Sequence, residues 1–396
     1  MINSKILPDK TTIDEILTRG VAETIEKSHL EKRLLSGEKL RVKLGIDPTS
    51  PNIHLGRSVV LLKLRDFQKL GHKIVFIIGD FTGTIGDTSD KDSERPMLSS
   101  ETVKKNMKEY ARQAAKIIDI KKAEVVYNSK WLKKLNFADI GFQADAFSLS
   151  DFISRDNIKR RLDIGKRVSL RETLYPLMQG YDSVVVKADI ELGGTDQKFN
   201  LLAGRVMQKA YGQEPQDILM TNLILGTDGR KMSSSFGNTV NITDTANDMF
   251  GKVMSIPDDL IITYFVHCTR VAMIEVKNIE KNLTSGTNPR DEKIKLAKEI
   301  VKIYYSDKVA NEAEKYFIDT FQKKEIPSEI AQFDIAGKNI VDALVETKLT
   351  ESKSEARRLI AEKGVKINSV VVESLDAKIK SGDIIQKGKR FFAKSR

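Results

Sequence analysis

The sequence predicts an α/β fold built on a doubly wound parallel sheet, followed by helices and a small α+β unit near the C-terminus. Short apolar runs alternate with amphipathic stretches from Val42 to about residue 226, as in the strands and helices of a parallel sheet. From about Thr243 to Ala331 the pattern is helical only, and strand patterns return after Asn339. The length of 396 residues allows two or three domains.

Hydrophobic periodicity predicts the elements of the first half of the chain. Continuous or alternating apolar runs predict strands over residues 42–46, 73–79 and 123–127. Amphipathic periodicity predicts helices over residues 11–35, from behind Arg57 to Gly71, and over 100–118. Thr11 and Ser100 are expected to cap the first and the last of these helices.

The second half of the sheet is predicted to follow an insertion. Residues 130–190 are mostly helical in pattern and interrupt the alternation. A strand is predicted over 183–187, a helix opening at Gly193–Gln197, and a last apolar strand over 218–226. In a doubly wound sheet, ligands bind at the carboxyl ends of the strands, so we expect the site there.

Charge indicates an anionic partner. The chain carries a formal net charge of +11, and residues 351–396 hold twelve Lys or Arg against six Asp or Glu. A second basic cluster runs from Arg155 to Arg171. Separate basic patches suit a long polyanion such as RNA, although two solvated charged faces are an equal alternative on charge alone.

Composition excludes several other classes of protein. No apolar run approaches the roughly 18 residues of a membrane span. The single cysteine, Cys268, excludes an internal disulfide and a cysteine-rich zinc site. The first ten residues lack the apolar core of a secretory signal, so a reduced, cytoplasmic location is expected.

One strand–turn–helix segment carries a phosphate-binding pattern. The strand over 42–46 leads through a proline-containing turn to His54, Gly56 and Arg57 at the start of a helix. A helix N-terminus offers free N–H groups and a positive dipole end to a phosphate. A histidine and a glycine at a turn are weak evidence alone, but Lys231 opens a second polar motif, Lys-Met-Ser-Ser-Ser, far downstream.

Together these two motifs resemble the HIGH and KMSKS signatures of class I aminoacyl-tRNA synthetases. Further matches narrow the resemblance to the bacterial tyrosyl-tRNA synthetases. They are Gly45-x-Asp47-Pro48-Thr49, Thr82-Gly83-x-Ile85-Gly86-Asp87, Tyr175-x-x-x-Gln179-x-x-Asp182 and Gly193-Gly194-Thr195-Asp196-Gln197. The C-terminal order SKSEARRLI, GVKIN and GDIIQ resembles an S4 RNA-binding domain.

The resemblance implies three domains. They are a Rossmann-like catalytic domain over residues 1–235 with its insertion at about 130–190, a helical anticodon-binding domain over 236–331, and an S4 domain over 338–396. It also implies a tyrosine–tRNA ligase that activates tyrosine with ATP and Mg²⁺ and transfers it to the 3′ end of tRNA(Tyr). A homodimer formed through the insertion is expected, with no structural metal and no membrane partner.

The resemblance also implies roles for individual residues. Catalytic roles fall on Thr49, His54 and Lys231. ATP-binding roles fall on Gly45, Asp47, Gly56, Arg57, Gly194, Asp196, Ser233 and Ser234. Tyrosine-binding roles fall on Thr82, Asp87, Asn128, Tyr175, Gln179, Asp182 and Gln197. RNA-binding roles fall on Arg357, Arg358, Lys366, Lys389 and Arg390.

Asp182 is the candidate for recognising the tyrosine hydroxyl. A buried polar partner left unpaired by phenylalanine can supply discrimination on the order of 10⁴ to 10⁵. Positions 175, 179 and 182 advance by four and three residues, so the side chains share one helix face. The resemblance implies that Tyr175, Gln179 and Asp87 hold the substrate ammonium group.

Three positions depart from the family pattern. Arg57 stands where the first motif ends in histidine, Ser234 replaces the second lysine of the later motif, and Lys43 stands where many members place a tyrosine. No role is assigned to Lys43 from the sequence. Two alternatives therefore stay open: tryptophan specificity on the same fold, and a catalytically weakened RNA-binding paralogue.

Overall fold

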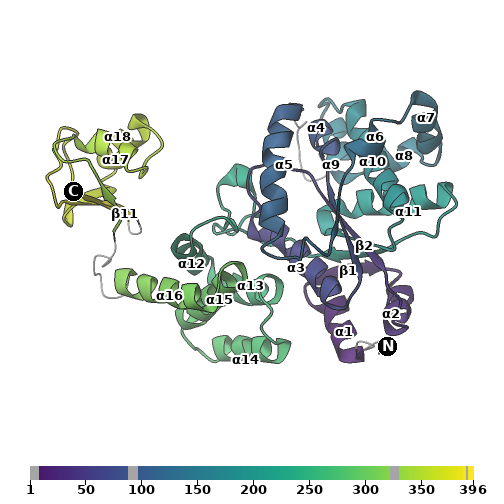
Figure 1. The fold of residues 1–396 in the computed structure, drawn as a ribbon, viewed down its shortest axis with the longest axis horizontal. Helices are drawn as coiled ribbons and strands as arrows, with labels where there is room; N and C mark the ends of the chain where they lie inside the picture. Colours follow the sequence, from purple (N-terminus) through teal and green to yellow (C-terminus); the bar gives the residue numbers. More distant parts are fainter. Residues whose placement is uncertain (1–8, 88–96, 322–329, 389–390) are drawn as a thin grey trace. The chain divides into compact units, whose positions relative to one another are not determined.

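The computed structural model describes residues 9–87, 97–321, 330–388 and 391–396. The chain divides into two compact units, Met1–Ser306 and Asp307–Arg396, which Figure 1 shows in sequence colours. The division into three domains predicted from the sequence stays a prediction.

A sheet of six strands, counted over the described residues, forms the centre of the first unit. Its strand order is β1-β6-β5-β2-β3-β4. The strands are β1 (Val21–Ile25), β2 (Arg41–Ile46), β3 (Lys73–Ile78), β4 (Glu124–Tyr127), β5 (Ile190–Gly194) and β6 (Asp217–Thr221). All neighbours pair in parallel except β1, which is antiparallel to β6. The order reverses between β2 and β5, and a crevice for ligands is expected at their carboxyl ends.

Helices flank this sheet (Figure 1). Those of the first half are α1 (Lys10–Thr18), α2 (Lys27–Leu35), α3 (Leu55–Lys69), α4 (Thr82–Ile85) and α5 (Ser100–Ala114). Helix α3 packs on β2, β3 and β5, and α11 (Lys198–Ala210) packs on β5 and β6 after the short helix η1 (Thr195–Gln197). No helix in the described part of the chain is long and apolar enough to cross a bilayer.

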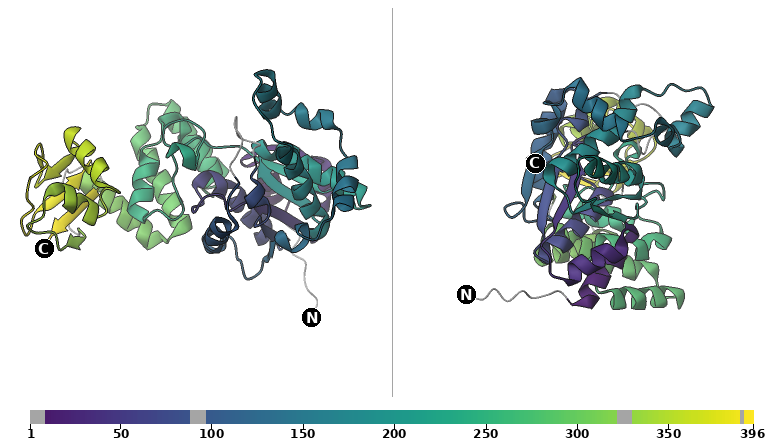
Figure 2. Two further views of the ribbon diagram at one scale, coloured as in Figure 1. Left: turned by 90° about the horizontal axis from the view of Figure 1, so that it is seen from above. Right: turned by 90° about the vertical axis from the view of Figure 1, so that its right-hand side faces the viewer.

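The predicted insertion between β4 and β5 is helical. It consists of α6 (Ser129–Leu132), α7 (Phe137–Asp145), α8 (Leu149–Ile153), α9 (Asp156–Asp163) and α10 (Leu170–Val186). Figure 2 shows the smaller helices of this segment lying outside the sheet. Helix α10 begins at a capping box formed by Ser169 and Glu172, and the buried Glu172 also pairs with Arg161 of α9.

Two predicted elements are wrong. The helix expected over 11–35 is interrupted by β1, because α1 ends before Gly20, which has a positive φ of 65°. The strand expected over 183–187 is the last turn of α10, which ends at Lys187 with φ 50°. Its three consecutive valines resemble a strand, but the true strand is β5.

Smaller differences concern caps and boundaries. Asp9 and Ser99 cap α1 and α5, one or two residues before the predicted Thr11 and Ser100. The last strand of the sheet ends at Thr221 rather than residue 226. Helices continue after the sheet, in α12 (Ala246–Met254), α13 (Ile261–Cys268), α14 (Met273–Thr284) and α15 (Pro289–Tyr304), with η2 (Ser234–Phe236) before α12 and η3 (Asp258–Leu260) between α12 and α13.

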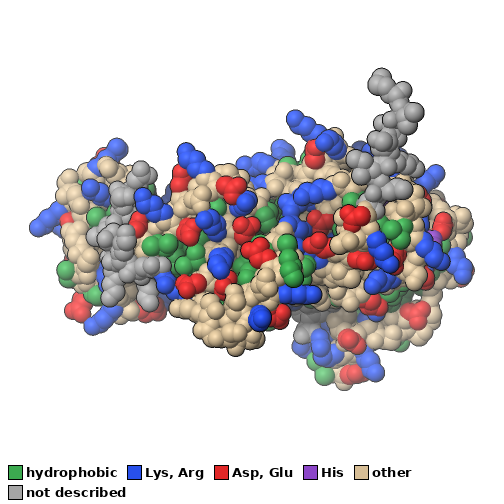
Figure 3. All heavy atoms as spheres, turned by 90° about the horizontal axis from the view of Figure 1, so that it is seen from below, with side chains coloured by type: hydrophobic (Ala, Val, Ile, Leu, Met, Phe, Trp, Pro, Cys, Tyr) green, Lys and Arg blue, Asp and Glu red, His purple; other side chains and the backbone are tan. Residues whose placement is uncertain are grey.

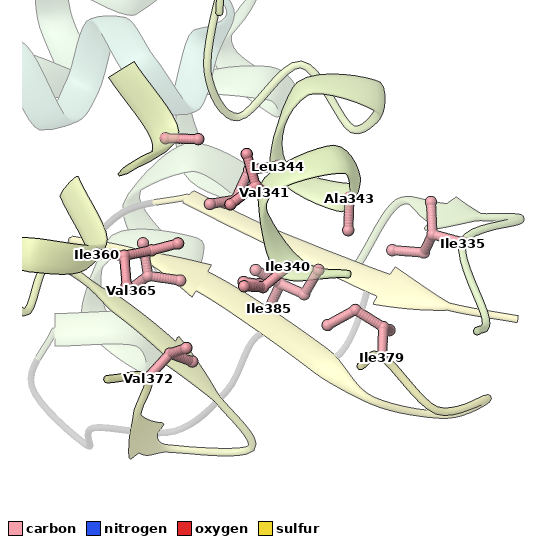
Figure 4. Packing of buried hydrophobic residues seen from close by; sticks show 11 residues of the cluster. Ile335, Ile340, Val341, Ala343, Leu344, Ile360, Val365, Val372, Ile379 and Ile385 are labelled. Atoms are coloured by element: carbon pink, nitrogen blue, oxygen red, sulfur yellow. The ribbon is translucent and has the colours of Figure 1, made fainter. Parts of the chain in front are cut away.

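The second unit holds a small α+β fold after α16 (Asp307–Phe321). Its helices are α17 (Ile340–Glu346) and α18 (Lys353–Ala361), and its strands are β7 (Gln332–Phe333), β8 (Val365–Ile367), β9 (Val370–Val371), β10 (Ile384–Lys387) and β11 (Phe391–Ser395). These strands form a sheet in the order β7-β11-β10-β8-β9. Figure 4 shows the core between helices and sheet, where Ile340, Leu344, Ile360 and Ile385 point toward one another.

Candidate active site

A cavity of about 700 Å³ opens at the carboxyl ends of β2 and β5, where the strand order reverses. Its walls contain all eighteen residues that the sequence assigned to catalysis, ATP or tyrosine. The chain therefore folds so that motifs up to 190 residues apart share one site, as expected of a doubly wound sheet. The individual roles of these residues stay predictions.

Asp182 is a buried carboxylate in this cavity. It is 4% exposed and lies on α10, where the helix spacing places it beside Gln179 and Tyr175. Trp131 Nε1 donates a hydrogen bond to Asp182 Oδ1 at 2.7 Å, and Asn128 Nδ2 donates to Oδ2 at 3.2 Å. Burial raises the pKa of Asp182 to about 7, against the charge of Lys43 and these two hydrogen bonds.

A second carboxylate, Asp47, directly follows β2 at the start of the turn. Thr82 Oγ1 donates to Asp47 Oδ1 at 2.7 Å, and Tyr175 donates its hydroxyl to Oδ2 at 2.8 Å. Burial raises the pKa of Asp47 to about 6. Asn128 Nδ2 donates to Thr82 Oγ1 at 2.9 Å, so a continuous set of hydrogen bonds joins Asp47 to Asp182.

The remaining tyrosine-site candidates are paired with one another or with β5. Gln197 Nε2 donates to Asp87 Oδ2 at 2.7 Å, and Gln179 Nε2 donates to Glu191 Oε1 at 3.1 Å. The three groups predicted to hold the ammonium, Tyr175, Gln179 and Asp87, therefore all line the cavity but have different partners.

His54 lies at the start of α3 and faces the cavity. It occupies the N-cap position with extended backbone, and its side chain is buried. Burial lowers the pKa of His54 to about 3, and the charges of Arg57 and Lys231 act in the same direction. Within the described residues, His54 Nδ1 has no hydrogen-bond partner. A neutral imidazole between two cations can donate to an anionic ligand without carrying charge itself.

The later motif packs directly on this turn. The backbone N–H of Gly56 donates to Met232 Sδ at 3.2 Å, and Leu55 N–H donates to the Val240 carbonyl at 2.8 Å. Lys231 Nζ lies 3.1 Å from Asp196 Oδ2, at the end of β5. The lysine and the histidine motifs thus meet at one end of the cavity.

Side chains within the loop shape its path. Asn238 Oδ1 accepts from the Ser233 N–H at 2.9 Å, while Asn238 Nδ2 donates to Asp228 Oδ1 at 2.7 Å. Ser233 caps the short helix η2, in which Ser234 is exposed. The serine that replaces the second lysine of the family motif therefore lies at the cavity rim.

Arg57 has partners that the sequence did not suggest. Its guanidinium donates to the hydroxyl of Tyr110 on α5 and, at 3.1 Å, to Thr49 Oγ1. Tyr110 Oη also lies 3.1 Å from Ser50 Oγ. The arginine is thus held over the Thr49 turn, beside the predicted phosphate site. Tyr110 carried no motif signal, because it comes from a helix whose approach is set only by the tertiary fold.

The predicted RNA-binding residues belong to the second unit. Arg357 and Arg358 are exposed on α18, and Lys366 is half-buried on β8. Arg358 also lines a hollow of about 1090 Å³ together with Lys348, Glu355 and Lys387. Lys389 and Arg390 lie outside the described residues. On the face drawn in Figure 3, Lys and Arg side chains are spread among Asp and Glu rather than gathered in one patch.

Comparison with known protein families shows which family the chain belongs to. Residues 35–322 match the family of tRNA synthetases class I (W and Y), and residues 319–393 match the tyrosine–tRNA ligase SYY-like C-terminal domain. The chain belongs to the tyrosine–tRNA ligase family. The resemblance inferred from the motifs is therefore confirmed over nearly the whole chain.

Full-length relatives agree with this assignment. Tyrosine–tRNA ligase 2 of Clostridium acetobutylicum is 47% identical over 96% of this chain and 98% of its own length. The tyrosine–tRNA ligase of Thermotoga maritima is 45% identical over 96% of both chains. Among solved structures, a tyrosyl-tRNA synthetase from Archaeoglobus fulgidus, complexed with L-tyrosine, superposes with a TM-score of 0.61 at 22% identity, covering 76% of this chain and 99% of that one. That likeness shows a shared fold.

Because the pKa of Asp182 is raised in the folded protein, the free energy of unfolding of this ligase should depend on pH. A carboxyl that holds its proton more tightly when folded stabilises the protein at low pH and loses that contribution as the pH rises. Asp182→Asn cannot ionise, so its free energy of unfolding relative to the parent should rise by about 3 kcal/mol from pH 4 to pH 7. Urea unfolding at both pH values measures this, and a difference independent of pH would contradict the burial of an ionisable Asp182.

Proposed function

We propose that this tyrosine–tRNA ligase forms tyrosyl adenylate in the 700 Å³ cavity, with Asp182 binding the phenolic hydroxyl and His54 and Lys231 binding the phosphates of ATP. The observation that carries the proposal is that one cavity contains a buried carboxylate and both phosphate motifs. ATP enters with Mg²⁺ as its substrate complex. We assign the ion to the nucleotide, because Mg²⁺ usually binds through substrate phosphates and keeps several of its waters.

Tyrosine selection follows from the hydrogen bonding of Asp182. Trp131 and Asn128 both donate to it, which favours the carboxylate over the carboxylic acid. A carboxylate accepts hydrogen bonds but donates none, so it suits a phenolic O–H. Phenylalanine would cover the carboxylate without offering a donor, and a buried unpaired acceptor is costly. Gln179, Tyr175 and Asp87, with Thr82, Asn128 and Gln197, would surround the rest of the amino acid.

The first chemical step requires positioning and charge stabilisation. A carboxylate oxygen of tyrosine forms a bond to the α-phosphorus of ATP as the bond from that phosphorus to pyrophosphate breaks. His54 and Lys231, with Thr49 and Arg57, would stabilise the negative charge on the departing pyrophosphate. Gly45, Asp47, Gly56, Gly194, Asp196, Ser233 and Ser234 would bind the rest of the nucleotide. No nucleophilic side chain is needed, because the substrate carboxylate is the nucleophile.

In the second step, a ribose hydroxyl at the 3′ end of tRNA(Tyr) attacks the tyrosyl carbonyl carbon and AMP leaves. We assign tRNA binding to the basic residues of the C-terminal unit and to the helices between residues 236 and 331. The exposed Arg357 and Arg358 on α18 suit a phosphate backbone. We place the reaction in the cytoplasm, where tRNA is charged.

Asp182→Asn tests the proposal. The amide keeps the size of the side chain but loses the charged acceptor, so kcat/KM for tyrosine in ATP–pyrophosphate exchange should fall about 10- to 100-fold. The KM for ATP should change little, and selectivity for tyrosine over phenylalanine should fall. Asp217→Asn is the matched control, because Asp217 is also buried but pairs with His29 outside the cavity.

Three results of that assay would contradict the proposal. Exchange driven by tryptophan would indicate the other specificity on this fold. If no amino acid supports pyrophosphate exchange, the chain is an RNA-binding paralogue without catalysis. Equal tyrosine selectivity in the Asp182→Asn variant and the parent would show that Asp182 does not bind the phenolic hydroxyl.

The RNA-binding role predicts a separation of the two steps. Replacing Arg357 and Arg358 together by alanine should weaken tRNA charging at low tRNA concentration and leave tyrosine-dependent pyrophosphate exchange unchanged. Removing two phosphate contacts should also lower the slope of log K against log salt by roughly two. Filter binding of tRNA over a salt series measures this slope. An unchanged slope together with unchanged charging would show that this face of α18 does not bind tRNA.

We also propose a homodimer formed through the insertion at residues 130–190. Large apolar side chains are exposed there, including Phe137 at 93%, Leu170 at 79% and Leu149 at 66%. Exposed apolar surface of this kind marks interfaces. Sedimentation should show a dimer for the parent and a shift toward monomer for Phe137→Glu. A monomeric parent would contradict this interface.

A further inference from the structure

A buried ion pair lies behind the proposed tyrosine site. Lys43 on β2 is 0% exposed and Glu191 on β5 is 1% exposed, with Lys43 Nζ 2.8 Å from Glu191 Oε1. Both residues line the cavity. Two such charges cost several kcal/mol to desolvate, so apolar residues of similar volume could serve stability equally well. The pair therefore needs an explanation other than stability.

The Lys43–Glu191 pair forms hydrogen bonds to helix α10. Lys43 Nζ donates to the carbonyl oxygen of Gln179 at 2.9 Å and to Ser183 Oγ at 2.6 Å. Glu191 in turn accepts from Gln179 Nε2 and from Ser183 Oγ, both at 3.1 Å. Gln179 and Ser183 lie one helical turn apart on α10 and flank Asp182. Side chains of β2 and β5 thus form hydrogen bonds to the part of α10 that carries Asp182.

Gln216, directly before β6, and Gly204 of α11 complete the network around Glu191. Gln216 Nε2 also donates to Glu191 Oε2. Gly204 of α11 leaves room for these groups, because a Cβ at that position would overlap the Gln216 amide and crowd Ser183 Oγ. All three ammonium protons of Lys43 have acceptors in Gln179, Ser183 and Glu191. Lys43 consequently acts on tyrosine through α10 and not by direct contact.

Lys43 also affects the charge state of Asp182. Burial raises the pKa of Asp182, and the charge of Lys43 is the largest effect in the opposite direction, while Glu191 raises this pKa further. Tyr175 on the same helix also interacts electrostatically with Asp182, and its own pKa is raised by burial and by Asp47. Among these groups, Lys43 supplies the positive charge that favours the carboxylate form.

We propose that Lys43, balanced by Glu191, is a positioning residue for tyrosine selection, which fixes α10 against the sheet and keeps Asp182 a charged acceptor for the phenolic hydroxyl. The inference rests on the proposed role of Asp182. It gives a function to a position for which the sequence offered none.

Lys43→Met tests the inference in the full-length ligase. Losing the charge should raise the pKa of Asp182 and reduce its ionised fraction at pH 7, by roughly tenfold for each pKa unit. We expect the KM for tyrosine in pyrophosphate exchange to rise about tenfold or more at pH 7. The KM for ATP should stay constant, and the profile of tyrosine KM against pH should shift to higher pH.

The double variant Lys43→Met with Glu191→Gln separates electrostatics from packing. It removes both charges, whose effects on Asp182 oppose each other, so its tyrosine KM and pH profile should return toward those of the parent. If Lys43 acted only by fixing α10, the double variant would be impaired at least as much as the single variant, and that result would overturn the electrostatic part of the inference. Lys63→Met is the matched control, because Lys63 is a buried lysine outside the cavity that donates to the carbonyls of Ile16 and Arg19.

Ser183→Ala provides a second test if Lys43→Met does not fold. It removes one acceptor of Lys43 without removing a charge, and the tyrosine KM should rise severalfold with no change in the KM for ATP. An unchanged tyrosine KM in the folded variants would overturn the inference. If Asp182→Asn alters selectivity but Lys43→Met does not, this inference alone fails. If Asp182→Asn has no effect, the proposed phenol site itself fails.

Discussion

Burial of carboxylates at one edge of a parallel sheet is the constraint on which this site depends. Asp182 and Asp47 are removed from water by the elements that surround them, and burial raises the pKa of both. Hydrogen-bond donors aimed at each carboxylate stabilise its charged form: Trp131 and Asn128 donate to Asp182, and Thr82 and Tyr175 donate to Asp47. The same low dielectric that makes burial costly makes an unmatched substrate costly, and the proposed selectivity for tyrosine rests on this cost.

The end of the cavity where we propose that phosphate binds carries positive charge. His54, Arg57 and Lys231 converge there from an early turn and a late loop, and the loop is attached to the turn through Met232 and Val240. The histidine stays neutral because burial and its two cationic neighbours disfavour a further charge. The carboxylates Asp182 and Asp87 thus lie among the proposed tyrosine-binding residues, and Arg57 and Lys231 lie among the proposed phosphate-binding residues.

The sequence predicted most of the sheet and every motif in the cavity, because both depend on local patterns. Apolar runs mark buried strands, and short motifs at strand ends converge once the sheet forms. It failed where tertiary contacts override local pattern: Val21–Ile25 forms an edge strand because β6 is available to pair with it, and the valines before Lys187 remain helical because α10 packs on α11. Trp131, Tyr110 and Glu191 were missed because their partners approach from distant elements at no fixed spacing.

The most direct test of the account is a crystal structure of the protein with an unreactive tyrosyl-adenylate analogue. The account predicts the phenolic oxygen within hydrogen-bonding distance of Asp182, with the phosphate group on the side of His54 and Lys231 and α10 unmoved against Lys43. A ligand bound with its phenol away from Asp182, or with its phosphate away from both basic residues, would contradict it.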